Sequence, residues 1–255
     1  MATSTLIAHC GAQVVTRDEL ALVKAPMPTR TWFPLAHSTV LARVETTLKE
    51  TGFHIEKETL AMTRAGARFF ATLDLASTIV EGVTLAVGVR NSIDKSLPIG
   101  FAAGHRVFVC DNLAFRGEVS VARKHSRFGE ARFAEALVRA AQGLKQFQAA
   151  EAARIRRFQA TEITSVEAES LMLRAYERDI VSHRLLPRVI AEYRQPSFEE
   201  FRAPTLWSLM NAFTTVLGER QRTNPQQFAA LTIRLSDLLG EAAGVRPEET
   251  FQLSA

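Results

Sequence analysis

The sequence contains only two cysteines, Cys10 and Cys110, among its 255 residues. Two thiols are too few for the disulfide framework of a small secreted domain, and they fit a reducing cytoplasm. No apolar run reaches the ~18 residues that a membrane span needs, because charged residues interrupt each run before that length. The segment Met1–Leu20 has no basic stretch ahead of an apolar run, so no secretory signal is expected. We therefore predict a cytoplasmic protein with no membrane segment.

The sequence also lacks the short motifs that mark common catalytic sites. It has no phosphate-binding loop that ends in Gly-Lys-Ser/Thr, no Gly-x-Gly-x-x-Gly run and no Gly-x-Ser-x-Gly elbow. Its six histidines form no His-Glu-x-x-His pair, and its cysteines form no Cys-x-x-Cys pair. The absence of these motifs argues against a nucleotide-hydrolysing motor and against a dinucleotide-dependent enzyme. No catalytic residue, metal or other cofactor is predicted.

The overall composition is that of a folded protein. Hydrophobic residues make up 47% of the chain, and the net charge is only +4. A disordered polar chain would have fewer apolar residues and more charge of one sign. The length fits one large domain or two small ones.

The positive charge is concentrated in residues 101–160. This stretch contains 11 Lys and Arg against 5 Asp and Glu, so the rest of the chain is slightly acidic. An acidic partner should therefore contact this stretch. The alternative is a solvated helix face with no partner. The excess falls into two groups, which are Arg123, Lys124 and Arg127, and then Arg154, Arg156 and Arg157.

Hydrophobic periodicity predicts an α+β fold. Apolar residues recur every three or four positions over residues 36–51 and from residue 130 to 160, which indicates two helices, the second one long and basic. Between them, alternating and β-branched runs with short gaps indicate an antiparallel meander of about five strands. Strands are expected at 54–64, 67–76, 83–92, 105–115 and 117–125. Further helices are expected at 164–178, 185–193, 205–217 and 225–239.

This pattern divides the chain into four parts. An irregular, proline-containing segment should occupy residues 1–34, because proline lacks a backbone donor. The α+β core with the sheet and the long basic helix should occupy residues 35–160. A helical C-terminal region should follow at 161–245, with a tail at 246–255. The basic stretch spans the change from strands to helices, so the two regions are expected to share one core.

Two polar segments could bind an anion. The first surrounds Arg90, Asn91 and Lys95, where a strand should end and a loop begin. Its cations suit phosphate, and its amide and hydroxyl groups can donate hydrogen bonds. The alternative is a loop whose Asn, Asp and Ser side chains satisfy its own backbone.

The second anion-binding segment is Arg123-Lys124-His125-Ser126-Arg127-Phe128. Its three cations flank an aromatic residue, and this combination suits a single strand of nucleic acid, with phosphates on the cations and a base stacked on Phe128. Alternatively, Phe128 is a core residue at the start of the long helix.

An enzyme is a further hypothesis. Cys110 could act as a nucleophile with His105 or His125 as its base, because a thiolate needs such a neighbour at neutral pH. Lys95 is the alternative nucleophile. However, Cys110 directly follows an apolar strand, and free cysteine is most often buried. Asp111, Asp94 and Lys95 would complete such a site only if the fold brings the two segments together.

Several of these runs together resemble one known family. The matching runs are Val89–Ser92, Asp94–Ser96, Gly104, Val107–Phe115, Lys124-His125 and Leu206–Thr214. Their order and spacing are similar to those of a prokaryotic family of phage- and plasmid-encoded proteins, known as domain of unknown function 932. The resemblance covers about residues 30–220 and implies a mobile-element setting. It supplies no activity and no catalytic residues, because the family is named for lacking an assigned function.

A looser resemblance is to the single-strand annealing recombinases of phages. Those proteins also place a β-meander before a long helix, bind DNA in a basic groove and often form rings. Resemblance of fold alone does not fix function.

The leading hypothesis is a nucleic-acid-binding protein of a phage, plasmid or other mobile element. It would bind or anneal single-stranded DNA in recombination or replication, as a homo-oligomer such as a ring. The predicted binding residues are Arg90, Asn91, Lys95, Arg123, Lys124, Arg127 and Phe128. The alternatives are the enzyme, with Asn91, Asp94, Lys95, Cys110, Asp111 and His125, and a scaffold or inhibitor that binds a host protein through an apolar patch.

Overall fold

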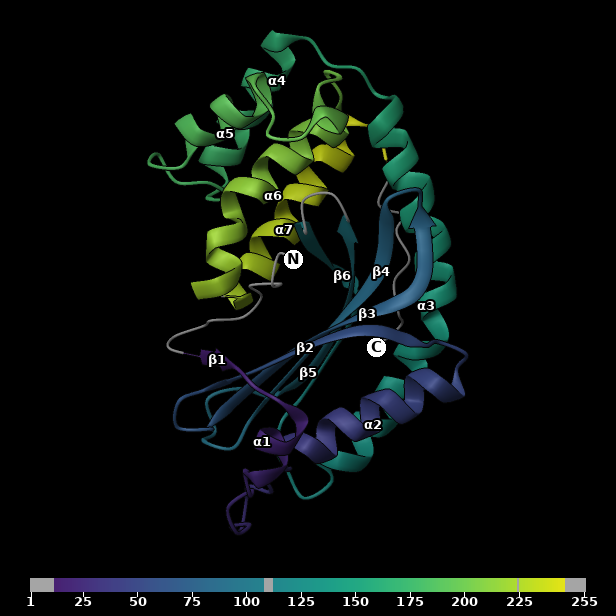
Figure 1. Cartoon of the computed structure of the whole chain (residues 1–255), viewed down its shortest axis with the longest axis vertical. Coiled ribbons are helices and arrows are strands. Elements are labelled where there is room, and N and C mark those ends of the chain that lie inside the picture. The colour runs from purple at the N-terminus through teal and green to yellow at the C-terminus, as the bar shows by residue number, and fades with distance from the viewer. Residues whose placement is uncertain (1–11, 108–111, 224, 246–255) are drawn as a thin grey trace.

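The protein is a six-stranded antiparallel sheet combined with α-helices, seen in a computed structural model that describes residues 12–107, 112–223 and 225–245 (Figure 1). Each strand pairs with its neighbour in the sequence, in the order β1-β2-β3-β4-β5-β6. The strands are β1 (Ala12–Val14), β2 (Ile55–Thr63), β3 (Arg68–Val80), β4 (Val83–Ser92), β5 (Ile99–Val107) and β6 (Asn112–Arg123). The predicted α+β class and antiparallel meander are confirmed, with one strand more than the expected five.

The expected strand at 105–115 is wrong in its bounds. It combines the end of β5 with the start of β6, which pair with each other through Val107 and Asn112. β5 begins earlier, at Ile99, and its sequence IGFAAGHRV is rich in small residues. Glycine and alanine carry little strand preference, so the alternation of large apolar residues that marks a strand is absent there.

The N-terminal segment is more regular than its prolines indicate. It contains β1 and α1 (Arg17–Leu22). Thr16 caps α1, because its side chain accepts a hydrogen bond from the backbone of Glu19 while the Glu19 carboxylate accepts one from the Thr16 backbone. Residues 23–36 then cross the surface with neither helix nor strand.

The remaining helices follow the predicted order. They are α2 (His37–Glu50), α3 (Gly129–Ala160), α4 (Ser165–Glu177), α5 (Leu186–Arg194), the single-turn η1 (Glu199–Phe201), α6 (Leu206–Thr223) and α7 (Pro225–Ala242). The capping box expected at Thr164 and Glu167 opens α4. The helices α6 and α7 extend beyond the expected residues 217 and 239.

One hydrophobic core joins the sheet to the helices. The residues of β3 that include Phe69 and Leu73 face α2 and α3, and the same cluster continues through α3 to Phe213 of α6. A second cluster on the other face of the sheet joins Phe70 to α7 through Phe228. The long helix α3 runs along the side of the molecule, from α2 to the α4–α7 helices (Figure 1). The α+β region at 35–160 and the helical region at 161–245 therefore share one hydrophobic core, as expected.

Candidate functional site

Three connections meet at one end of the sheet. They are the β2–β3 turn (64–68), the end of β4 with the β4–β5 loop (90–98), and the β6–α3 connection (123–128). The strand register places them together, because Arg68 pairs with Ser92 and Ile99 pairs with Arg123. An antiparallel meander brings alternate connections to the same end, so segments far apart in sequence become neighbours.

A fourth segment, residues 23–36, lies across the same end of the sheet. The backbone N–H of Phe33 donates to the carbonyl of His125 at 2.9 Å. The side chain of Asn91 donates to the carbonyl of Leu35, also at 2.9 Å. The β2–β3 turn packs closely against Val23 of this segment. Gly66 in that turn has φ +64°, and a Cβ added there would lie 3.2 Å from the Val23 side chain. We refer to residues 23–36, 64–68, 90–98 and 123–128 together as the basic loops.

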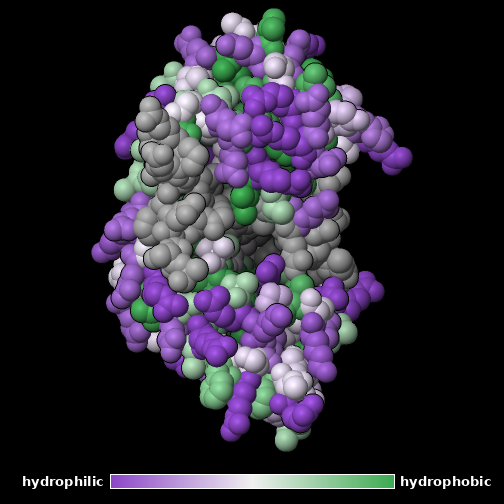
Figure 2. Space-filling model, turned by 180° about the vertical axis from the view of Figure 1, so that it is seen from behind, coloured by the Kyte–Doolittle hydropathy of each residue, from purple (hydrophilic) through white to green (hydrophobic). Residues whose placement is uncertain are grey.

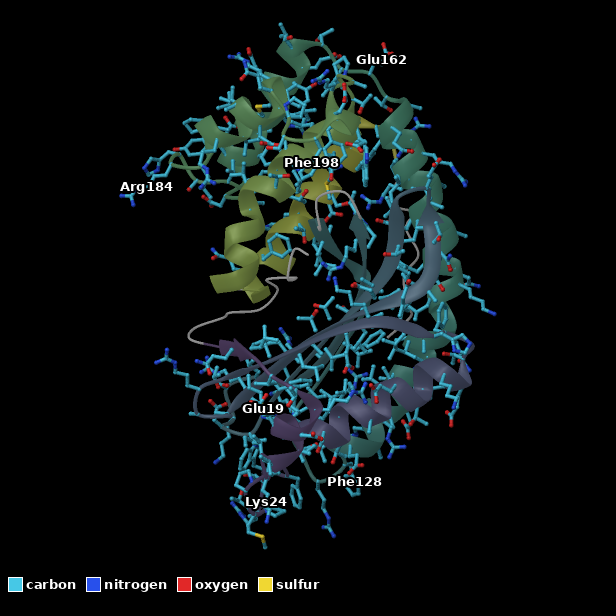
Figure 3. The ribbon with its side chains drawn as sticks, in the orientation of Figure 1. Glu19, Lys24, Phe128, Glu162, Arg184 and Phe198 are labelled. Atoms are coloured by element: carbon cyan, nitrogen blue, oxygen red, sulfur yellow. The ribbon has the colours of Figure 1, made fainter. Side chains whose placement is uncertain are left out.

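The basic loops gather much of the positive charge of the protein. Their only acidic residue is Asp94, so the remainder of the chain carries more acidic than basic residues. Lys24 and Phe128 lie at the lower end of the molecule in Figure 3, although 23–36 and 123–128 are distant in sequence. This collection is more basic than any single stretch of the sequence, because the fold adds cations from four segments. The cations are Lys24, Arg30, Arg64, Arg68, Arg90, Lys95, Arg123, Lys124 and Arg127.

Lys95 occupies a turn that fixes its position. Its φ of 67° is left-handed, which is uncommon for a residue with a Cβ. The turn is held by the carboxylate of Asp94, which accepts from the backbone of Ser96 at 2.9 Å and lies 3.4 Å from the guanidinium of Arg68. The ammonium of Lys95 lies 5.0 Å from the centre of the Trp32 ring. The loop therefore holds an exposed cation over an aromatic face.

Arg90 lies flat across β5. A Cβ added to Gly100 would lie only 2.6 Å from the Nε atom of Arg90, so glycine is needed at that position for the side chain to cross. Burial lowers the pKa of Arg90. Arg90, which was predicted to contact a phosphate, is thus half-buried at the edge of the basic loops.

The β6–α3 connection presents the predicted aromatic residue to solvent. Phe128 is 61% exposed at the N-cap of α3, so the alternative that it is a core residue is wrong. The guanidinium of Arg127 lies 5.9 Å from the centre of its ring. Lys124 and Arg127 are exposed, and Arg123 is partly exposed. The cations and the aromatic ring are therefore free to contact a ligand together.

Asn91 has a different role from the surface contact that was expected. It is fully buried on the α2 side of the sheet, where its NH₂ group donates to the Leu35 carbonyl and to Nδ1 of His37 at 3.0 Å. Nε2 of His37 then donates to the carbonyl of Gly66 at 2.9 Å. These bonds fix the orientation of the Asn91 amide, because a flipped amide would place its oxygen against two acceptors.

His125 and Trp32 complete a buried polar cluster beside Asn91 and His37. The rings of Trp32 and His125 meet edge to face, with centroids 6.5 Å apart. Within the described part of the chain, four buried polar atoms here have no partner in hydrogen-bonding geometry: Trp32 Nε1, Asn91 Oδ1 and both ring nitrogens of His125. Leaving such a group unpaired costs about 1–3 kcal/mol. We call Trp32, His37, Asn91 and His125 the buried polar cluster.

Burial makes both histidines of this cluster poor proton acceptors. It lowers the pKa of His37 and of His125 below the ordinary value of 6.5. The backbone of Phe33 lies close enough to His125 to oppose this shift without reaching hydrogen-bonding geometry. Both rings are therefore neutral at pH 7, and His37 carries its proton on Nε2. No local sequence pattern predicts that these four residues meet, because they come from separate segments.

The lowered pKa values predict that the protein loses stability in mild acid. The unfolded chain binds protons more readily than the folded one, so the stabilisation is present above pH 6.5 and declines below it. Between pH 7 and pH 5.5 each histidine should lower the free energy of unfolding by up to about 1 kcal/mol. Urea titrations at the two pH values measure this loss. Equal unfolding free energies would contradict the neutral state of both rings.

The second group of predicted cations lies far from the basic loops. Arg154, Arg156 and Arg157 belong to the C-terminal end of α3, which at ~1.5 Å per residue is about 40 Å from Arg127. Arg154 is buried and paired with Glu151, and Arg157 donates to the carbonyl of Ala243. A single acidic partner for the whole stretch 101–160 is therefore not favoured by the fold.

The enzyme hypothesis gains little from the structure. Cys110 and Asp111 lie outside the described residues. Asp94 is engaged with Arg68 and Ser96 in the loop, while His125 lies within the buried polar cluster. Among the residues that the structure describes, no cluster of His, Cys, Asp and Glu could hold a metal ion.

The fold and the site define an α+β protein in which an antiparallel meander and a long helix present a basic end above a buried polar cluster. A family model described as a domain of unknown function (DUF932) matches residues 27–239. Because this match covers most of the chain, the protein belongs to that family. No curated protein and no solved structure matches the chain. Within the described ranges, no helix has the length and apolar character needed to cross a membrane.

Proposed function

We propose that the protein binds single-stranded nucleic acid, with DNA as the favoured form, through the basic loops, in the setting of a phage, plasmid or other mobile element. The observation that carries this proposal is the collection of cations from four separate segments at one end of the sheet, with Asp94 as the only acid in those segments. Phosphate neutralisation by Lys and Arg supplies most of the affinity of a sequence-independent binder.

The exposed aromatic residue favours a single strand over a duplex. Phe128 is 61% exposed between Arg127 and the start of α3. Stacking of a base on such a ring requires an unpaired base, because the faces of paired bases are covered in a duplex. Lys24 and Lys95 extend the basic surface on the 23–36 and 90–98 segments.

The competing scaffold hypothesis requires a broad apolar surface. On the face shown in Figure 2, hydrophobic side chains of the described residues form scattered groups among hydrophilic ones. That face therefore offers no support for a scaffold that docks through an apolar patch.

The proposal predicts steeply salt-dependent binding. Each neutralised phosphate of a single strand contributes a slope of about −0.7 to the plot of log affinity against log salt concentration. Five contacts, from Arg90, Lys95, Arg123, Lys124 and Arg127, should weaken binding about 100-fold between 50 and 200 mM salt. Fluorescence anisotropy of a labelled single strand measures the slope. Absence of salt-sensitive binding at low ionic strength would refute the proposed function.

A further inference from the structure

Three residues of the buried polar cluster, Trp32, Asn91 and His125, belong to the basic loops themselves, and the unpaired atoms of the cluster include both donors and acceptors. The indole Nε1–H of Trp32 is a donor, and Oδ1 of Asn91 is an acceptor. The neutral ring of His125 offers one donor and one acceptor. Asn91 is fully buried and His125 is 6% exposed, so these are not ordinary surface groups. Buried polar atoms without partners are rare in folded proteins, which points to a role beyond packing.

The mixture of donors and acceptors distinguishes the possible ligands. A phosphate oxygen only accepts hydrogen bonds, so Oδ1 of Asn91 would oppose it. The Asn91 amide cannot turn its NH₂ group inward without losing its bond to Nδ1 of His37, which lies on α2 outside the 23–36 segment. The edge of a nucleobase carries donors and acceptors side by side and has no charge. The cluster therefore suits a base rather than the backbone of a nucleic acid.

The segment that covers the cluster has no regular secondary structure. Residues 23–36 contain Pro26, Pro28 and Pro34 and form no helix or strand. The bond from Phe33 to the His125 carbonyl and the bond from Asn91 to the Leu35 carbonyl tie this segment to the sheet end. Trp32 belongs to this segment, and its ring contacts the ammonium group of Lys95. A nucleic-acid strand that binds the basic loops thus approaches the cluster at this irregular segment.

We propose that the buried polar cluster binds the hydrogen-bonding edge of one nucleobase of the strand whose phosphates contact the basic loops. This inference rests on the proposed function, and it deepens that function by assigning contacts to a base as well as to phosphates. The 23–36 segment shifts when the base enters, and Trp32, Asn91 and His125 then gain the partners that they lack.

The test replaces His125 by phenylalanine. A phenyl ring is also planar and aromatic, although slightly larger, and it has no nitrogens to leave unpaired, so the Tm of the variant should equal or exceed that of the wild type. A structural role for the ring nitrogens would instead lower Tm by several degrees, and this result would overturn the inference. A gain in stability with a loss of binding is the pattern expected of a functional site.

The binding readout compares a natural single strand with one that contains abasic sites and has the same phosphates. The wild type should prefer the natural strand about tenfold, as the loss of one or two hydrogen bonds to a base implies. His125→Phe should reduce this preference to about twofold, because stacking on Phe128 remains. Trp32→Phe, which removes the indole donor together with part of the aromatic ring system, should reduce it as well. The matched variant Trp207→Phe, in the core beside His105, should keep the wild-type preference.

The outcomes separate the inference from the proposed function. Salt-sensitive binding with an equal preference in wild type and His125→Phe would overturn the base-binding role and leave the phosphate contacts standing. Loss of salt-sensitive binding altogether would refute the proposed function, and the inference would fall with it. A reduced preference in both His125→Phe and Trp32→Phe, with Trp207→Phe unchanged, would support the inference.

Discussion

Replacing Arg123, Lys124 and Arg127 together by alanine is expected to weaken the binding of single-stranded DNA about 100-fold at 0.1 M salt. Each lost phosphate contact removes a counterion-release contribution of about fivefold at this salt concentration. The slope of the salt dependence should fall by about 2 for the same reason. The weakening should be alike for any sequence, because phosphate contacts carry no sequence information. Anisotropy titrations at several salt concentrations measure both quantities.

A matched variant separates local contacts from net charge. Lys145, Arg156 and Arg184 are exposed cations away from the basic loops, and Arg184 lies in the upper, helical half of the molecule in Figure 3, whereas Phe128 lies near the lower end. Their replacement by alanine removes the same charge, but interactions between exposed charges fade beyond about 10 Å at 0.1 M salt. This control should therefore lose little affinity. Equal losses in the two triple variants would show that the binding site lies elsewhere.

The parts of the fold that the sequence predicted are those with strong periodicity. Val40, Val44 and Leu48 recur along α2 and are all buried, as an amphipathic helix requires. The start of β5 was not predicted, because Gly100 and Gly104 occupy positions where large apolar residues would show the alternation that is typical of a strand. The small residue at 100 has a reason that only the structure reveals, since Arg90 crosses the sheet there.

The candidate site was predictable only where it is continuous in sequence. The cations of 123–128 were found because they are adjacent, whereas Arg64 and Arg68 join them through strand pairing. Lys24 joins them because the 23–36 segment crosses the same end of the sheet. Asn91 was expected at the surface because polar residues near a strand end usually form turns. It is buried because α2 places His37 against it. Such a contact between distant segments follows from the tertiary fold and has no local sequence signal.

A large loss of folding stability is expected when a buried ionic network that joins the sheet to the C-terminal helices is broken. The carboxylate of Glu151, on α3, lies 2.7 Å from Nδ1 of His105 on β5. Arg154 donates from Nε to the same carboxylate at 2.9 Å and also contacts Ser236 on α7. Glu151 is 3% exposed and Arg154 is 7% exposed. The network thus connects three elements through charges that water cannot solvate.

Glu151→Ala should lower the free energy of unfolding by about 3–5 kcal/mol, because it leaves the guanidinium of Arg154 buried without its counter-charge. The double variant Glu151→Leu with Arg154→Met should recover much of this loss, since apolar residues of similar volume often replace a buried ion pair without cost. Urea denaturation followed by circular dichroism measures both changes.

An exposed ion-pair network provides the control for this prediction. Glu241 lies 2.9 Å from both Arg174 and Arg178 and its side chain is 50% exposed. Glu241→Ala should therefore lower the free energy of unfolding by only about 1 kcal/mol or less. Similar losses for Glu151→Ala and Glu241→Ala would mean that water reaches Arg154 once Glu151 is removed. A much larger loss at Glu151 would show that the network holds the α3 and α7 helices against the sheet, and hence supports the scaffold on which the basic loops are placed.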